Sequence, residues 1–188
     1  SFSNVSFWNN TLIGNSALLQ VGSSGFTAFT DVQIFNSTLD GSIIVATQGQ
    51  ELTMANCRFF DIKIEPESIL ILASLSTLTT ISDSIFKDIV IAGGSQLIKS
   101  EYNELMTLRN NQFYSTQFDT SGTDSEGVVD SSVIYIVQAV LALSNTTFIA
   151  SDTILYADSA TLQLENIYNE NITQNSDTQG YLIGYDST

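Results

Sequence analysis

An Asn or Asp recurs about every 27 residues along this chain, and the pattern around it recurs as well. Seven positions share this slot, which we call the first turn row: Asn4, Asp31, Asn56, Asp83, Asn110, Asn145 and Asn166. The position two residues earlier is apolar throughout: Phe2, Phe29, Met54, Ile81, Leu108, Leu143 and Leu164. Three residues after the row, six copies hold a bulky apolar residue: Phe7, Ile34, Phe59, Phe86, Phe113 and Phe148. This periodicity indicates a repeat protein, in which each copy packs against the next.

Each copy contains three short apolar runs rich in Ile, Val, Phe and Thr, which are too short for helices and typical of strands. The first run ends at the Asn or Asp, and the third usually begins at a Ser, as in Ser132–Ile136. Apolar residues occupy even offsets before the first turn row and odd offsets after it, so the chain must bend there. Asn and Asp suit such a bend because they tolerate the left-handed backbone conformation.

Three strands per copy, joined by bends, predict a coil in which each strand pairs in parallel with its equivalent in the next coil. An ordinary parallel sheet needs helical crossovers, and the sequence contains no amphipathic segment of that kind. We therefore predict an all-β fold, a parallel β-helix solenoid of about seven coils with three short strands and about 27 residues per coil.

The Asn-terminated strand, the bend after it and the stacked Phe positions together resemble right-handed parallel β-helix proteins of the pectin-lyase-like superfamily. The resemblance covers the whole chain and implies the fold more than any activity. Within that group, the coils rich in Ser, Thr and Asn look more like large repetitive extracellular surface proteins and adhesins of microbial eukaryotes and bacteria than like the compact enzymes.

We expect residues 1–188 to form a single β-helix domain, since 43% of the residues are hydrophobic and no stretch is typical of a linker. The interval between Asn110 and Asn145 is longer than the others, which predicts an exposed loop inserted at residues 119–130. The chain starts in mid-strand without an initiator Met, so we expect a fragment of a longer chain or a subunit of an assembly.

The net charge of −15, with five basic residues and no His, disfavours binding to nucleic acid or to an anionic membrane. A solvated, secreted surface accounts for this acidity. The single cysteine, Cys57, occupies the same slot as Val5 and Val32, so we interpret it as a buried apolar thiol; a reactive thiol is the alternative.

Catalysis has one candidate pair of residues in this sequence. The resemblance implies that lyases and hydrolases of this fold use clustered acids with Arg, Lys or His, and His is absent here. Asp61 and Asp88 share a slot in neighbouring copies and would stand about 5 Å apart, which suits carboxylate chemistry. The same slot holds Asn9, Asn36 and Ser115, so a second turn row explains it as well.

A hard cation such as Ca²⁺ has a weak candidate site in the inserted loop, formed by Asp119, Asp124, Glu126 and Asp130. Their spacing matches neither the EF-hand loop nor the glycine-rich nonapeptide repeat. A solvated loop is the other interpretation, and we expect no further cofactor.

Five Asn-x-Ser/Thr acceptors for N-glycosylation occur, at Asn4, Asn9, Asn36, Asn145 and Asn171. We expect Asn9, Asn36 and Asn171 to carry sugar because their slot closes the second strand at an exposed bend. We expect Asn4 and Asn145 to be bare, because their amides would bond to backbone groups of adjacent coils and leave no room for a saccharide.

Two functional hypotheses follow. The first is a non-catalytic structural or adhesive β-helix module of an extracellular surface protein or filament, with further coils or other copies stacked end to end as partners. The second is a polysaccharide-binding or polysaccharide-cleaving domain that uses Asp61 and Asp88 with exposed aromatic residues such as Trp8, Phe60 and Tyr114. Both place the protein outside the cell or on its surface.

Overall fold

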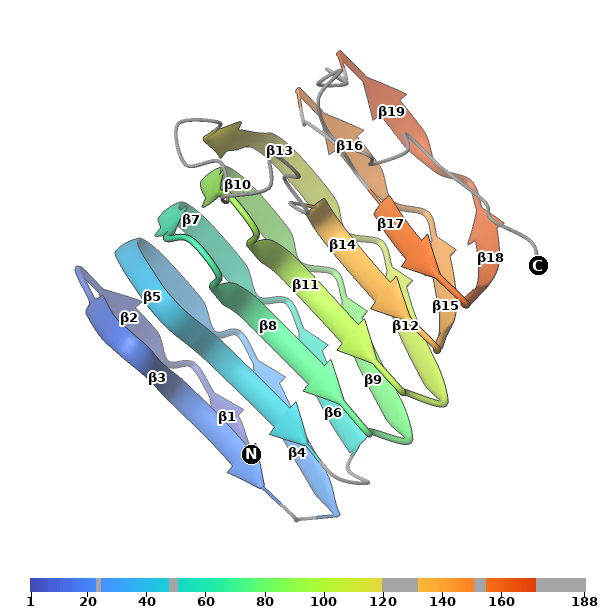
Figure 1. The fold of residues 1–188 in the computed structure, drawn as a ribbon, viewed down its shortest axis with the longest axis horizontal. Helices are drawn as coiled ribbons and strands as arrows, with labels where there is room; N and C mark the ends of the chain where they lie inside the picture. The colour runs from blue at the N-terminus through green and yellow to red at the C-terminus, as the bar shows by residue number, and fades with distance from the viewer. Residues whose placement is uncertain (23–24, 48–50, 120–131, 151–154, 172–188) are drawn as a thin grey trace.

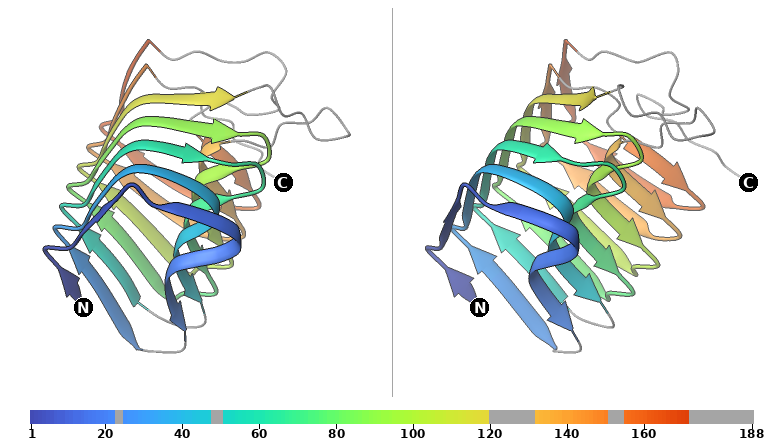
Figure 2. Two further views of the ribbon diagram at one scale, coloured as in Figure 1. Left: turned by 90° about the vertical axis from the view of Figure 1, so that its left-hand side faces the viewer. Right: turned by 60° about the vertical axis from the view of Figure 1, so that its left-hand side comes forward.

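The computed structural model describes residues 1–22, 25–47, 51–119, 132–150 and 155–171 (Figure 1). Over these residues the chain is all-β without a helix, and every strand pair is parallel. Figure 2 shows that successive strands wind around a common interior and return to lie beside their equivalents. This arrangement fits a β-solenoid, as the repeat predicts.

One sheet, here called face 1, contains the strand that precedes the first turn row in each repeat. Its strands pair in the order β1 (Phe2–Ser3), β4 (Phe26–Thr30), β6 (Glu51–Ala55), β9 (Leu78–Ser82), β12 (Leu105–Arg109), β15 (Val140–Ser144) and β18 (Thr161–Glu165). Residues about 27 apart are register partners, for example Thr53 with Thr80 and Thr80 with Thr107.

The remaining strands form a second, twelve-stranded sheet, which bends to make up two sides of the coil, here called face 2 and face 3. Face 2 follows the first turn row and contains β2 (Ser6–Trp8), β7 (Arg58–Ile64), β10 (Ile85–Ala92), β13 (Gln112–Asp119), β16 (Thr147–Ile149) and β19 (Tyr168–Glu170). Face 3 returns the chain to face 1 and contains β8 (Ile69–Ser74), β11 (Gln96–Glu101), β14 (Ser132–Val137) and β17 (Leu155–Asp158). Two long strands, β3 (Thr11–Gly22) and β5 (Gln33–Thr47), continue around the bend, and β5 pairs with both β7 and β8.

Three rows of left-handed residues mark bends in the chain, one between faces 1 and 2, one within face 2 and one between faces 3 and 1. All seven residues of the first turn row have φ between 47° and 55°. The second turn row, five residues further on, has φ between 44° and 53° and consists of Asn9, Asn36, Asp61, Asp88, Ser115, Ala150 and Asn171. A third row joins face 3 to face 1 at Leu75, Tyr102, Gln138 and Ser159. In each case, the left-handed residue and the residue before it both point outward, which resets the alternation of the strand.

The second turn row ends the second strand in some repeats and not in others. Asn9, Ala150 and Asn171 directly follow the ends of β2, β16 and β19, as the sequence predicts for this row. Asn36, Asp61, Asp88 and Ser115 lie within β5, β7, β10 and β13, respectively, and these strands continue across the bend. The prediction was wrong for these four repeats because a single left-handed residue kinks a strand while the residues beyond it keep pairing with the next repeat.

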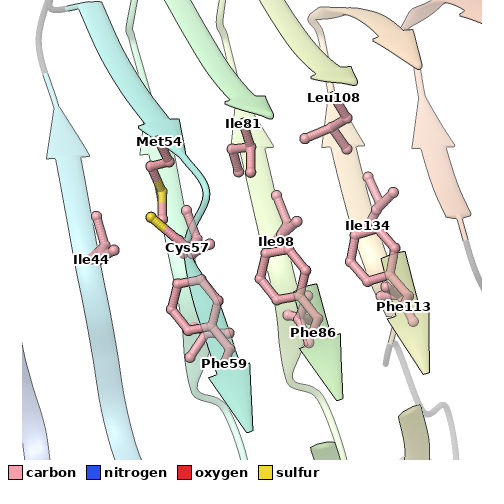
Figure 3. Close-up of a cluster of buried hydrophobic side chains, with 14 of the residues drawn as sticks. Ile44, Met54, Cys57, Phe59, Ile81, Phe86, Ile98, Leu108, Phe113 and Ile134 are labelled. Carbon is pink, nitrogen blue, oxygen red and sulfur yellow. The ribbon is translucent and has the colours of Figure 1, made fainter. Parts of the chain in front are cut away.

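The interior is filled by apolar rows that run along the stack (Figure 3). Phe59, Phe86, Phe113 and Phe148 are fully buried, and their ring centroids follow one another at 4.8 Å. The rings are parallel to within 8° because register partners with the same rotamer stack at the strand spacing. The rings of Phe86 and Phe113 therefore have both faces covered by neighbouring rings.

A buried polar row lies among these apolar rows and was not expected from the sequence. The residue after each left-handed residue points inward, and in several repeats its backbone N–H donates to a side-chain oxygen in the next repeat. The N–H of Cys57 donates to Ser84 Oγ at 3.1 Å, and that of Ser84 donates to Asn111 Oδ1 at 3.0 Å. The Asn111 amide then donates to the carbonyl of Ile81 at 2.8 Å. These bonds satisfy backbone groups where the kink interrupts the sheet.

Candidate functional site

Face 2 carries outward-facing aromatic, acidic and basic side chains, which are the candidates for ligand binding or catalysis. The position before the second turn row points outward, and in the first three repeats it holds Trp8, Phe35 and Phe60. Their ring centroids are 5.0 and 5.3 Å apart, and the rings are tilted by 38° and 53°. Trp8 is 65% exposed, whereas Phe35 and Phe60 are half-buried. The three residues form a continuous row, here called the aromatic row.

Tyr114 occupies the same row two repeats beyond Phe60, with Lys87 between them in register. Sequence reasoning named Trp8, Phe60 and Tyr114 as exposed aromatics but missed Phe35, which connects Trp8 to Phe60. The periodicity contains the signal for this connection, since Phe35 lies four residues after Asp31, as Phe60 does after Asn56.

Asp61 and Asp88 lie in neighbouring repeats, both exposed and both left-handed, with φ of 53°. The Asp88 carboxylate pairs with Lys87 Nζ at 3.6 Å. Face 2 also carries Arg58 and Lys63, and Lys63 Nζ lies 2.8 Å from Glu65. The hydrogen bond from Lys63 to Glu65 raises the pKa of the lysine. Arg109 lies apart from these cations, on face 1.

Acid–base catalysis needs groups that converge on one reacting atom. Asp61 and Asp88 are exposed carboxylates at a bend, and Lys87 pairs with Asp88. Their geometry matches that of the other residues in the second turn row, which include Asn, Ser and Ala.

The first turn row forms a ladder of side-chain hydrogen bonds on the surface. Asn56 Nδ2 donates to Asp31 Oδ1, Asn110 Nδ2 to Asp83 Oδ1 at 3.0 Å, and Asn166 Nδ2 to Asn145 Oδ1 at 3.1 Å. Asn and Asp alternate in the first five repeats, so two carboxylates are never adjacent there. The bond from Asn110, followed by one from Ser82 and by the charge of Arg109, lowers the pKa of Asp83.

The structure overturns the reason for expecting Asn4 and Asn145 to be bare. Both side chains are exposed, as are those of Asn9, Asn36 and Asn171. The bonds to backbone groups of adjacent repeats are made by their backbone N–H groups, which donate to the carbonyls of Thr30 and Glu165. The sequence argument had assigned these bonds to the side-chain amides. The glycosylation of all five residues stays a prediction.

Other candidate residues from the sequence contribute less. Asp124, Glu126 and Asp130 lie outside the described residues, so the proposed cation loop is represented only by Asp119. Within the described ranges, no group of three or more His, Cys, Asp or Glu side chains is placed to hold a metal ion. Cys57 is fully buried, and burial raises the pKa of its thiol. No helix capable of crossing a membrane occurs in the part of the chain that the structure describes.

Comparison with known proteins gives few leads. No protein-family model matches the chain, and no curated protein matches it in sequence. Among solved structures, the chain is similar to a candidate glycosyl hydrolase from Parabacteroides merdae ATCC 43184, with a TM-score of 0.35 and 9% identity over 92% of this chain and 85% of that one. It is also similar to QnrB1, a plasmid-mediated fluoroquinolone resistance protein, with a TM-score of 0.21 and 12% identity over 91% and 92% of the two chains. Such low TM-scores carry no argument about fold or function.

Proposed function

We propose that this chain is a parallel β-helix of about seven coils that serves as a non-catalytic structural or adhesive module of an extracellular surface protein or filament. The supporting observation is that its exposed polar groups form rows along the stack and bond to their own equivalents. A catalytic centre needs different groups that converge on one point. Here each row repeats one geometry at the strand spacing, which suits a scaffold or an extended contact surface.

The proposed partners are further coils or other copies of the chain, stacked end to end. At the two ends of the described stack, β1 and β18 each pair on one side only. Large apolar side chains are exposed in these end repeats, including Phe2 and Trp8 at one end and Leu164 and Tyr168 at the other. Strands that are unpaired on one side among the described residues, next to exposed apolar side chains, offer a surface on which a neighbouring coil would continue the same pairing.

Polysaccharide binding or cleavage is the second candidate, and the aromatic row next to the second turn row favours it. Sugars stack on open ring faces, however, and the rings of Trp8, Phe35 and Phe60 are about 5 Å apart along the stack. Phe35 therefore has an aromatic ring on each side, and Phe60 has Phe35 on one side and Lys87 on the other. Asp61 and Asp88 are also exposed, and Lys87 pairs with Asp88. The scaffold function is therefore the better supported.

The deciding experiment measures both the cleavage of glycans by the protein and the end-to-end assembly of the protein itself. Purified protein is incubated with polyuronate and with neutral glycans, and released reducing ends or unsaturated products are measured. The same preparation is examined by electron microscopy for end-to-end assemblies. We expect assemblies and no turnover.

Turnover that disappears in the double variant Asp61→Asn, Asp88→Asn would overturn the proposal. The matched control is Asn9→Ser, Asn36→Ser, which alters the same turn row in other repeats. Equal loss of turnover in both double variants would indicate damage to the bends, and selective loss in the first would indicate catalysis.

A further inference from the structure

All five N-glycosylation acceptors lie on the two turn rows. Asn4 and Asn145 belong to the first row, and Asn9, Asn36 and Asn171 to the second. Each has a positive φ between 44° and 53° and an exposed side chain. The central residue of the acceptor motif points inward, as Ser37 and Thr146 do, whereas the following Ser or Thr begins or continues a strand on face 2. The Thr173 that completes the motif of Asn171 lies outside the described residues.

The acceptors differ in what their side-chain nitrogen does. Among the described residues, Nδ2 of Asn4, Asn9 and Asn145 makes no hydrogen bond, and the ladder bonds of Asn9 and Asn145 use their Oδ1 atoms as acceptors. A saccharide attached to these nitrogens would leave both ladder bonds intact. Nδ2 of Asn36 is different, because it donates to Asn9 Oδ1 at 2.8 Å.

Asn9 and Asn36 are also direct neighbours. Their flanking residues are register partners, Trp8 with Phe35 and Thr11 with Thr38, so the two bends stand one strand spacing of about 4.8 Å apart. An N-linked glycan is a bulky, branched group that must project from the surface. Two glycans leaving the same edge at this spacing would compete for the same volume.

We infer that Asn4, Asn9 and Asn145 carry N-linked glycans and that Asn36 carries one only in molecules in which Asn9 is bare. The inference rests on the extracellular location in the proposed function. It adds Asn4 and Asn145 to the acceptors expected from the sequence and makes Asn9 and Asn36 mutually exclusive. The bends of the first two repeats then carry two glycans, one on each turn row.

One tryptic peptide of this chain contains three of the acceptors, so the mass of the intact peptide gives the number of glycans that occur together. Residues 1–57 contain no Lys or Arg, so trypsin releases Asn4, Asn9 and Asn36 together in one peptide that ends at Arg58. Protein secreted from a eukaryotic cell line is digested, and the mass of the intact glycopeptide is measured by mass spectrometry. Enzymatic glycan release in heavy-oxygen water, which converts each used Asn to labelled Asp, then assigns the positions. We expect two glycans on this peptide, at Asn4 and Asn9, and one at Asn145.

A pair of variants at Thr11 tests the exclusion. Thr11→Ala removes the motif of Asn9 without touching the bend, and Thr11→Ser retains the motif as the matched control. In Thr11→Ala, Asn36 should become occupied to the level that Asn9 has in the wild type, so the peptide still carries two glycans. In Thr11→Ser, Asn36 should stay bare.

Three glycans on the wild-type peptide, or an Asn36 that stays bare in Thr11→Ala, would refute the exclusion. A folded, secreted protein with bare Asn4 and Asn145 would refute the added acceptors. These results would leave the scaffold proposal standing, because assembly and turnover are measured separately and on unglycosylated protein.

Discussion

Truncation of Phe86 should reveal how much the central stack contributes to stability. Phe86 is fully buried, and the rings of Phe59 and Phe113 lie 4.8 Å away on either side, nearly parallel to it. Phe86→Ala removes the buried ring and leaves a cavity that costs about 3–5 kcal/mol. Two ring contacts, each contributing about 0.5–1.5 kcal/mol, are lost as well. We expect a loss near the upper end of the cavity range, about 5 kcal/mol.

Phe7 supplies the comparison, because it holds the same slot in the first repeat. Its side chain is half-buried, and its register partner is Ile34, which offers no ring to stack on. Phe7→Ala should therefore cost about 2 kcal/mol, roughly half of the buried case. Both free energies of unfolding are measured by urea denaturation, with circular dichroism confirming that the variants keep their strands. Equal losses at the two positions would refute the proposed order of repeats.

Two further substitutions and one labelling experiment test other parts of the structure. Asn111→Ala leaves the N–H of Ser84 and a carbonyl of face 1 without partners and should cost about 2–4 kcal/mol in the same assay; a loss below about 1 kcal/mol would mean that water replaces the amide. Asn110→Asp removes the donor to Asp83 and places two carboxylates side by side, so it should destabilise the protein at about pH 7 but not at about pH 3, and a pH-independent loss would contradict this. The thiol of Cys57 should react with a disulfide reagent no faster than the protein unfolds, and rapid labelling of native protein would show that the interior is open.

The lowered pKa of Asp83 explains why Asn110→Asp should destabilise the protein at neutral pH and not in acid. Its pKa is lowered in the folded protein, so its carboxylate contributes stability at neutral pH that is lost as the pH falls through the folded-state pKa. Asn110→Asp replaces the hydrogen bond that is the main cause of this lowering with a like charge. The pKa of Asp83 should then rise, and protonation in acid should relieve the repulsion.

The first turn row and the stacked Phe positions could be predicted from the sequence because one residue type recurs at each. Asn and Asp stabilise left-handed bends, and Phe fills an interior position, so the repeat can be recognised from the residue types at these positions. The third turn row could not be predicted in this way. Leu75, Tyr102 and Gln138 have positive φ although their side chains disfavour it, so neighbouring strands impose these bends.

The buried polar row and the exposure of Asn4 and Asn145 were missed for a related reason. Ser84 and Asn111 follow apolar residues in the same slot of earlier repeats, which suggested an apolar row. Whether a side chain bonds to backbone or to its own equivalent depends on the kink geometry. The same uncertainty affected Asn4 and Asn145, because the residue type fits either a buried row bonded to backbone groups or an exposed row on the surface.

The stacking of equivalent bends is the central claim, and cysteine cross-linking tests it most directly. In a Cys57→Val background, Asp61→Cys and Asp88→Cys place two thiols one strand spacing apart, about 4.8 Å, which is within the Cα range of disulfides. Asn36→Cys and Asp88→Cys place them two spacings apart, about 10 Å, which is too far. Stacked bends predict that mild oxidation closes a disulfide in the first pair and leaves the second pair free. A cross-link in the second pair, or none in the first, would contradict the stacking.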